Sequence, residues 1–416
     1  MILLKLTTIG RTCQVGDGNH STIARQNFGV LYLTSKNFKD GKLDLNKVCY
    51  ISENDYSKHF DGASKALSKP EKDDLVFSII GTLGEPYLVR GTDRFGLSSS
   101  VAIVRPRRSI LDPRYLLYWS KSPIFQNKLY GIKGGVAQGY VSLEMLRSLP
   151  VPELSILVQR RIADILSTYD DLIENNTRRI KILEEMARLI YREWFIEFKA
   201  PGIKLRKASP EEKKVTGKDV FPEEWEIGIV NDLLSLKSGF AFKSGKFIDN
   251  GRYGLVTIKN VQDGSFNPET TSRLDELTES MPDYCIIETG DILMSLTGNI
   301  GRVCLTYGSD LLLNQRVSKI VPLRKEDNAI SYCLFRQTEM QRKLEMISNG
   351  VAQQNLSPIE TGKLVITIPS KEIRDEFHKV VTPLLKMIIQ MYQANSNLRQ
   401  TRDLLLPKLI SGEVEV

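Results

Sequence analysis

The chain has 416 residues, of which 41% are hydrophobic and 26% charged, as in a folded protein of two or three domains. Lysine and arginine exceed aspartate and glutamate by seven, which permits an anionic partner without requiring one. Five dispersed cysteines without CxxC spacing and three distant histidines give no support to a disulfide framework or a metal site. No apolar run approaches the roughly 18 residues of a membrane span, so we expect a cytoplasmic protein.

Residues 1–152 predict a globular α+β domain. Runs that favour strands at 29–34, 75–80 and 101–104 are separated by turn residues, and a helix is expected over 112–121. Asp112 followed by Pro113 is a typical helix start. The segment Asp112-Pro113-Arg114-Tyr115 also approaches the loop that holds the target amino group in amino-methyltransferases, but the second proline of that loop is absent. We therefore interpret the segment as a helix start.

Residues 153–199 predict one long helix. Seam residues recur at alternating steps of four and three, and no glycine or proline interrupts 153–200. The seam consists of Ile162, Leu166, Tyr169, Ile173, Asn176, Ile180, Leu183, Ala187, Ile190 and Trp194. At about 1.5 Å per residue, this ladder would be about 48 Å long, as expected of a spacer.

Residues 200–220 predict a basic linker. The stretch 199–219 has seven Lys or Arg against three acids, together with Pro201, Gly202, Pro210 and Gly217. We interpret its charge as a solvated surface rather than a binding site.

Residues 221–369 repeat the first domain in the same order. Segment 36–41 matches 259–264, segment 74–84 matches 291–301, and segment 135–142 matches 350–357. Strands are expected over 254–258, 291–296 and 317–321, with a helix over about 329–346. The chain is therefore an internal tandem repeat of one domain and one long helix.

Residues 370–416 predict a second long helix with its tail. Its seam contains Phe377, Val381, Leu384, Ile388, Met391, Asn395, Leu398, Arg402, Leu405 and Leu409. Pro383 lies inside this pattern, so we expect a kink or a new helix start at Thr382-Pro383.

The two ladders predict an antiparallel coiled coil. With full overlap, Ile162 would face Leu409 and Trp194 would face Phe377. Asn176 would then meet Asn395, and this polar pair would fix the register, since a slip of one heptad would place an amide against apolar residues. The alternative is that each asparagine is a solvated defect. Two similar domains joined by such a helix pair would suit a target with two separated parts, and bipartite duplex DNA is the natural candidate. The ladder of about 48 Å would span about 14 base pairs of duplex.

Matching loops in the two halves hold candidate DNA-binding residues. Asn and Gln can bond the adenine edge and Arg the guanine edge, while small residues in the turns (Ser78, Gly81 and Gly84; Ser295, Gly298 and Gly301) allow close approach. The candidates are Lys36, Asn37, Thr82, Gln138 and Tyr140 in the first half, and Lys259, Asn260, Thr297, Asn299, Arg302, Gln315, Arg316, Gln353, Gln354 and Asn355 in the second. The alternative for each is a structural role. The loop side chains differ between the two halves, as expected if the two domains recognise different DNA sequences.

No catalytic or cofactor motif is recognised. There is no P-loop, and the turn glycines do not have dinucleotide-binding spacing. Glu211, Glu212 and Lys213 could end a nuclease site, but no paired aspartate precedes them. We expect no catalytic residue, no metal and no cofactor.

The whole chain resembles the specificity subunit of Type I restriction-modification systems. The resemblance rests on the tandem repeat, the segment 290–301 and its first-half counterpart, the Gly-x-x-Gln loops, the helix around Asn175-Asn176 and the terminal segment 404–413. It implies two target recognition domains, each binding half of a bipartite duplex site, and two long helices that act as a ruler. It also implies docking of two DNA methyltransferase subunits, which use S-adenosylmethionine, and association with ATP-driven restriction subunits. The subunit itself would be non-catalytic.

Two other functions remain open at this stage. One is a structural adaptor whose domains bind proteins and whose coiled coil sets a distance. The other is a self-contained methyltransferase, which would transfer methyl groups by itself.

Overall fold

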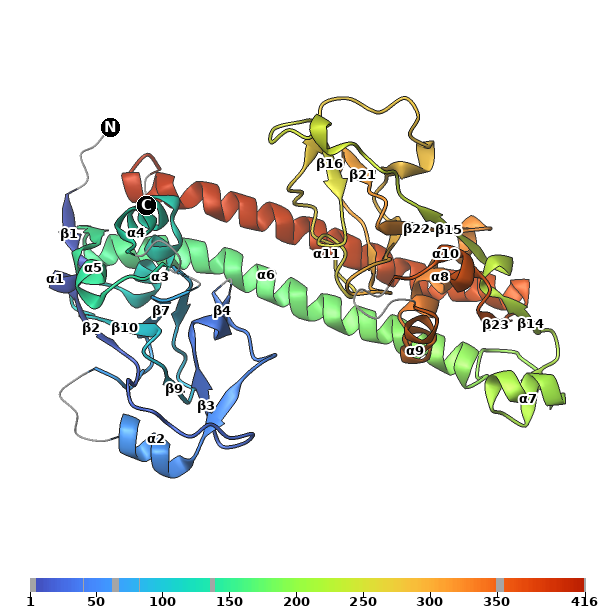
Figure 1. Ribbon diagram of the computed structural model, residues 1–416, viewed down its shortest axis with the longest axis horizontal. Coiled ribbons are helices and arrows are strands. Elements are labelled where there is room, and N and C mark those ends of the chain that lie inside the picture. Colours follow the sequence, from blue (N-terminus) through green and yellow to red (C-terminus); the bar gives the residue numbers. More distant parts are fainter. Residues whose placement is uncertain are drawn as a thin grey trace. The chain divides into compact units, whose positions relative to one another are not determined.

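The computed structural model describes residues 5–39, 41–61, 67–81, 83–134, 139–348 and 355–414, and the chain divides into two units. The first unit comprises Met1–Leu172 and Leu398–Val416, and the second comprises Ile173–Asn397. Both are built from mixed sheets and helices (Figure 1).

The first unit is organised around a four-stranded antiparallel sheet. Its strand order is β2 (Cys13–Asp17), β10 (Val101–Pro106), β7 (Leu75–Ser78) and β8 (Pro86–Leu88). A second sheet has the order β6 (Cys49–Ile51), β3 (Val30–Leu33) and β9 (Phe95–Leu97), with β3 parallel to β9. Two short pairs complete the strands, β1 (Leu6–Thr8) with β11 (Pro150–Pro152) and β4 (Phe38–Lys39) with β5 (Lys42–Leu43). The helices are α1 (Ile9–Thr12), α2 (Glu53–Phe60), α3 (Pro113–Lys121), α4 (Pro123–Ile132) and α5 (Leu143–Ser148), with a 3-10 turn η1 (Ser35–Asn37).

The second unit repeats this topology. Its four-stranded sheet has the order β15 (Leu234–Ser238), β22 (Val317–Pro322), β19 (Ile292–Ser295) and β20 (Val303–Leu305). The companion sheet has the order β17 (Arg273–Leu274), β16 (Tyr253–Val256), β21 (Leu311–Leu313) and β18 (Ile286–Ile287), and β16 is parallel to β21. The pair β14 (Glu226–Ile229) and β23 (Val365–Ile368) corresponds to β1 and β11. Helices α8 (Asn328–Phe335), α9 (Thr338–Ile347) and α10 (Pro358–Gly362) accompany 3-10 turns η3 (Val230–Asp232), η4 (Ser244–Lys246), η5 (Asp283–Cys285) and η6 (Lys325–Asp327). The predicted α+β class and internal repeat are confirmed.

Two predicted elements differ from the structure. The helix expected over 329–346 is divided into α8 and α9, with Gln337 in an extended conformation. The Gln341 side chain donates to the Phe335 carbonyl at 2.6 Å, which gives that carbonyl a partner outside a continuous helix. The stretch predicted as a linker is ordered, because β12 (Leu205–Lys207) and β13 (Val220–Pro222) pair around α7 (Pro210–Thr216).

Two long helices span 36 and 41 residues. Helix α6 runs over Ile156–Tyr191 and ends in a π-helical turn, η2 (Arg192–Ile196), and α11 runs over Lys371–Ser411. A new helix start at Pro383, one of the two expected outcomes, is wrong, since α11 passes through it. Pro383 lies on an exposed face, so water can satisfy the carbonyl that has lost its amide partner.

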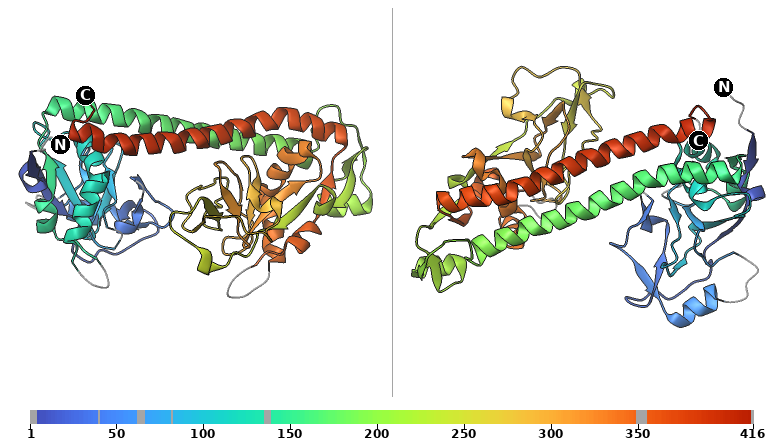
Figure 2. Two further views of the ribbon diagram at one scale, coloured as in Figure 1. Left: turned by 90° about the horizontal axis from the view of Figure 1, so that it is seen from above. Right: turned by 180° about the vertical axis from the view of Figure 1, so that it is seen from behind.

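The helices pair antiparallel within each unit (Figure 2). In the first unit, Ile162, Leu166, Leu406 and Leu409 share one buried cluster. In the second, Ile180, Leu183, Phe377 and Ile388 share another, and the Trp194 and Phe377 ring centroids are 5.7 Å apart. The Trp194–Phe377 pairing of the predicted register is thereby confirmed. Of the helices in the described part of the chain, none has the length and apolar character needed to cross a membrane.

Candidate nucleic-acid interface

Each unit presents a tight turn after a buried central strand. In the second unit the turn follows β19, and Gly298 and Gly301 have φ of 74° and 69°. In the first it follows β7, and Gly81 and Gly84 have φ of 81° and 83°. These values lie in the left-handed region that glycine adopts without strain. The Gly84 amide donates to Ser78 at 3.1 Å and the Gly301 amide to Ser295 at 2.9 Å, so the two turns share one hydrogen-bonding pattern.

A glutamine braces each turn from the adjoining helices. Gln126 Nε2 donates to the carbonyls of Gly84 at 2.9 Å and Ser120 at 2.6 Å. Gln341 Nε2 donates to the carbonyls of Gly301 at 2.8 Å and Phe335 at 2.6 Å. Neither glutamine was among the predicted site residues. The internal repeat could have identified the pair, because Gln126 and Gln341 are separated by the same number of residues as the two matching Gly-x-x-Gln loops.

A second segment lies beside each turn. The Val141 amide donates to Ile79 at 2.9 Å, and the Leu356 amide donates to Leu296 at 2.8 Å. This pairing sets Tyr140 opposite Ile80 in the first unit and Asn355 opposite Thr297 in the second. Three of the candidate residues, Thr297, Asn299 and Asn355, therefore gather at one turn. Thr82, Gln138, Gln353 and Gln354 lie outside the described residues.

Asn37 and Asn260 have structural partners for their whole amide groups. Asn37 Oδ1 accepts from the Thr34 amide and hydroxyl, and its Nδ2 donates to the carbonyls of Asp44 and Lys47. Asn260 makes the equivalent bonds with Thr257, Asn267 and Glu269. Both side chains are buried, so in this conformation neither amide is free to pair with a base edge.

The remaining candidates lie on or near the surface. Lys36 and Lys259 are exposed one residue before the buried asparagines. Gln315 and Arg316 are exposed between β21 and β22, and the Arg316 carbonyl accepts from the Leu296 amide at 3.0 Å, which places Arg316 beside the β19 turn. Arg302 donates from its guanidinium to Gln262 Oε1 at 2.7 Å.

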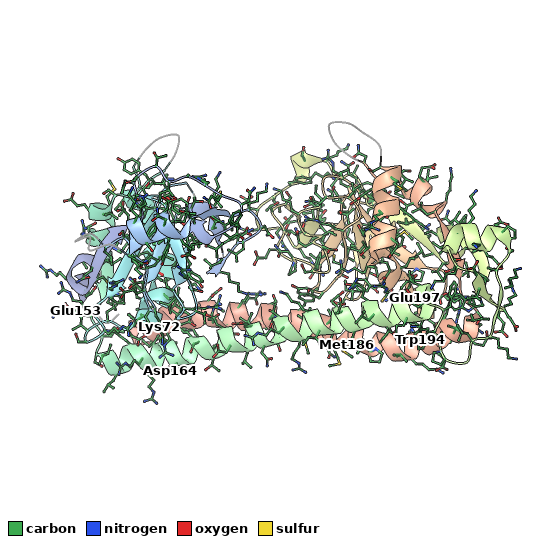
Figure 3. The ribbon with its side chains drawn as sticks, turned by 90° about the horizontal axis from the view of Figure 1, so that it is seen from below. Lys72, Glu153, Asp164, Met186, Trp194 and Glu197 are labelled. Carbon is green, nitrogen blue, oxygen red and sulfur yellow. The ribbon has the colours of Figure 1, made fainter. Side chains whose placement is uncertain are left out.

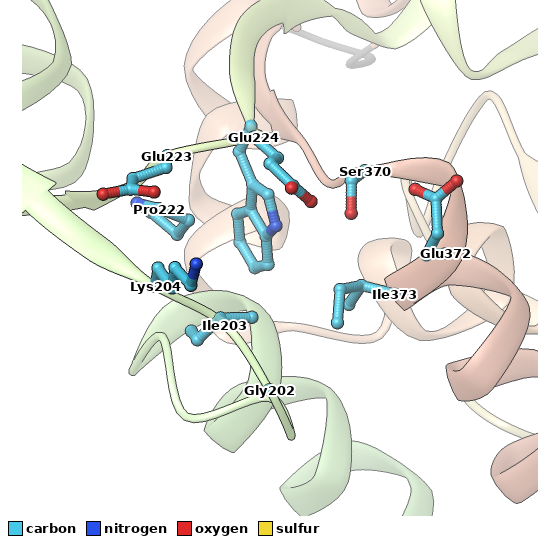
Figure 4. Close-up of a pocket in the computed structure, with 10 residues that line it drawn as sticks. Gly202, Ile203, Lys204, Pro222, Glu223, Glu224, Ser370, Glu372 and Ile373 are labelled. Carbon is cyan, nitrogen blue, oxygen red and sulfur yellow. The ribbon is translucent and has the colours of Figure 1, made fainter.

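A small pocket of about 180 Å³ lies elsewhere in the second unit. Figure 4 shows Glu223 and Glu224 on the segment leading to β14, and Ser370 and Glu372 at the start of α11. Its three carboxylates disfavour an approaching phosphate backbone. Within the described ranges, no group of three or more His, Cys, Asp or Glu could hold a metal ion.

A polar network ties each unit to α6. In the first unit Asp170 accepts from the Tyr118 hydroxyl at 2.8 Å and is paired with Arg402 of α11. In the second, Glu184 accepts from the Tyr332 hydroxyl at 2.6 Å and lies 3.6 Å from Arg336. Burial raises the pKa of the Glu184 carboxyl, although Arg336 and Tyr332 oppose the shift.

Between Asp170 and Glu184 on α6, Asn176 Nδ2 donates to Asn395 Oδ1 at 3.0 Å, so the predicted asparagine pairing is confirmed. Figure 3 labels Asp164 and Met186 on this helix and Trp194 in the π-helical turn that ends it.

Comparison with known proteins identifies the family. Residues 29–185 and 222–398 each match the model of the Type I restriction modification DNA specificity domain. The Type I restriction enzyme HindI specificity subunit of Haemophilus influenzae is 24% identical over 408 residues, covering 85% of this chain and 88% of that protein. The MjaIX specificity subunit of Methanocaldococcus jannaschii is 27% identical over 311 residues, covering 73% and 69%.

A crystal structure of a Type I restriction-modification S subunit from M. genitalium has the same fold, with a TM-score of 0.55 at 17% identity over 98% of this chain and 97% of that one. With two copies of the domain covering most of its length, the chain belongs to the family of Type I restriction-modification DNA specificity subunits.

Proposed function

We propose that the first domain, residues 1–152, and the second, residues 221–369, each read one half of a bipartite duplex DNA site. The observation that carries this proposal is the pair of braced turns, which share one backbone frame and differ in the side chains they present. In the second unit Asn299, Gln315, Arg316 and Asn355 are exposed at or beside the turn. Asn and Arg side chains match the hydrogen-bonding pattern of base edges in the major groove.

The two long helices, within residues 153–199 and 370–416, would set the gap between the half-sites. Their unbroken helical spans and their antiparallel packing within each unit support a stiff spacer. The ladder of about 48 Å corresponds to about 14 base pairs from one end to the other.

The same helices would dock two DNA methyltransferase subunits, with restriction subunits joining that complex. Apolar side chains on the outer face of α6 support a docking role, because Leu172, Ile182, Met186 and Leu189 are 44–59% exposed. Methyl transfer would then belong to the docked subunits. We expect no transfer from labelled S-adenosylmethionine by the purified chain alone.

A binding series tests the proposal. Duplexes selected for affinity to the full chain are remade with gaps shortened and lengthened in single base pairs. A recognition subunit will bind best at one gap and will lose affinity when either half-site is scrambled. Affinity that ignores both gap and sequence would favour the alternative, a coiled-coil adaptor whose domains bind proteins.

A further inference from the structure

Equivalent positions at the two turns carry side chains of opposite character. Ile80 and Tyr140 are 37% and 46% exposed in the first unit, where the second unit has Thr297 and Asn355. Because the flanking backbone hydrogen bonds are equivalent, the two units place apolar and polar side chains, respectively, at the same position of the fold.

Two further residues, one aromatic and one basic, lie beside this turn in the first unit. Tyr130 of α4 is 48% exposed, and its hydroxyl donates to the Leu83 carbonyl at 3.4 Å, within the turn. Lys133 Nζ lies 5.8 Å from the centre of the Tyr130 ring. We call Ile80, Tyr130, Lys133 and Tyr140 the tyrosine surface.

The Tyr140 ring lies against Gly134. Gly134 and Tyr140 exchange backbone hydrogen bonds at 3.0 and 3.1 Å. A Cβ at position 134 would come within 2.8 Å of the ring carbons, so glycine leaves room for the ring in this position. A tyrosine ring has only two side-chain torsions and offers a large contact area at a small entropic cost on binding.

The charge around the tyrosine surface suits a polyanion. Between Asp112 and Glu144 the sequence has four basic residues and no acidic one. Lys128 and Lys133 in this stretch are exposed at and just beyond α4. Lys128 and Lys133 can therefore attract the phosphate groups that flank a contacted base.

The second unit offers hydrogen bonding at the equivalent place. Asn355 is exposed, and its carboxamide has the donor and acceptor that match the adenine edge. The Thr297 hydroxyl opposite is buried and, among the described residues, makes no hydrogen bond. The position of Tyr130 is taken by Glu345 of α9, which removes the aromatic character.

We infer that the two half-sites are recognised by different chemistry at this equivalent position: the tyrosine surface contacts the C5 methyl group of a thymine, and Asn355 hydrogen-bonds an adenine edge. The thymine methyl is the one apolar group that a base pair presents in the major groove, so an apolar surface distinguishes it. This inference rests on the proposed function and specifies which base edges the two domains read.

Base analogues test the inference on the full chain. In a duplex selected for affinity, each thymine is replaced in turn by deoxyuridine, which lacks only the methyl group, and each adenine by 7-deazaadenine, which lacks the N7 acceptor. One deoxyuridine in one half-site should weaken binding about fourfold, the value for losing one buried methyl. One 7-deazaadenine in the other half-site should weaken it about fivefold or more.

Variants connect these effects to residues. In Tyr140→Asn, which installs the second unit's residue, the deoxyuridine effect should vanish while discrimination in the other half-site persists, and that persistence shows that the chain is folded. Tyr140→Phe keeps the ring and should keep the effect. Asn355→Ala should remove the 7-deazaadenine effect alone.

Three results would overturn the inference. The first is specific binding in which no deoxyuridine matters, the second is a deoxyuridine effect that survives in Tyr140→Asn, and the third is a 7-deazaadenine effect that survives in Asn355→Ala. Binding that ignores base sequence altogether is a distinct result, because it would defeat the proposed function and the inference with it.

Discussion

Asn176 Nδ2 donates a hydrogen bond to Asn395 Oδ1 at 3.0 Å across the two long helices, and Asn395 is 2% exposed. Asn395 Nδ2 also lies 3.5 Å from the Thr177 hydroxyl. Asn176→Leu should lower the free energy of unfolding by about 1–3 kcal/mol, because a buried amide loses its donor. Urea denaturation measures the change, and Asn175→Ala, at an exposed neighbouring position, is the control.

The double variant, Asn176→Leu with Asn395→Leu, separates stability from register. We expect it to be more stable than Asn176→Leu alone, because two apolar residues pack together without an orphaned amide. Crosslinking between cysteines introduced on the two helices should then detect more than one register. A single register in the double variant would show that the asparagines do not determine alignment.

Glu184 anchors the second unit to α6 through Tyr332 and Arg336. Glu184→Ala should lower the free energy of unfolding by about 1–3 kcal/mol, because it leaves the buried Tyr332 hydroxyl without its acceptor. It also removes one of the two carboxylates beside the Arg336 guanidinium, which keeps its ion pair with Asp263. Glu185→Ala removes the adjacent exposed pair with Arg188 and should cost less than about 1 kcal/mol. Similar losses in the two variants would contradict the anchoring role.

Inserting seven residues into each helix tests the spacer. Insertions after Leu172 and after Leu398 lie near the boundary between the units and keep the seam in phase. Each adds about 10 Å, so the preferred gap should lengthen by about three base pairs while the half-site sequences stay the same. The matched control inserts seven residues into α6 alone and should disrupt helix pairing. An unchanged gap in the double insertion would refute the ruler.

Gln353→Ala with Gln354→Ala should relax specificity in the half-site read by the second domain and spare the other. Selection from randomised duplexes gives the preference at every position for wild type and variant. Gln390→Ala, at an exposed position of α11, is the control. Equal losses in both half-sites would count against independent domains.

The ordered segment at 205–222 should respond to acid. The Arg206 guanidinium and the Ser209 backbone amide lower the pKa of Glu212 to about 2. Because this folded-state pKa lies below the ordinary value of 4.5, the contribution is fully present above about pH 4.5 and is lost as the pH falls through about 2. The difference in melting temperature between wild type and Glu212→Gln should therefore shrink as the pH falls from 5 toward 2. A difference independent of pH would contradict this assignment.

The elements with strong periodicity were predictable from the sequence. The seam residues Ile162 and Ile180 are buried, and the register that follows from their spacing brings Trp194 to Phe377 and Asn176 to Asn395. The internal repeat predicted the central strands, because apolar runs followed by glycine-containing turns recur in the same order in both halves. These features depend on spacing along the chain, which a sequence states directly.

Other features depended on whether a polar side chain bonds to the nearby backbone or stays free for a ligand, which residue spacing alone does not determine. Asn37 and Asn260 were predicted as DNA contacts, but a threonine three residues earlier in each case signals a local capping arrangement. Ser209-Pro210-Glu211-Glu212 is likewise the pattern of a capped helix start, which identifies α7 inside the predicted linker. Which loop side chains approach one another depends on the tertiary pairing of Tyr140 and Asn355 with the turns.

Within each unit, the side chains that hold the turn are different from those that it presents. In the second unit, Gln341 satisfies the Gly301 carbonyl of the turn, while Asn355 and Arg316 are exposed beside it. Substitutions at exposed positions usually change stability by less than about 0.5 kcal/mol. Natural selection can therefore explore new rim residues in one copy of the duplicated module without weakening its framework, and lineages can diverge in the sequences they protect while inheriting one architecture.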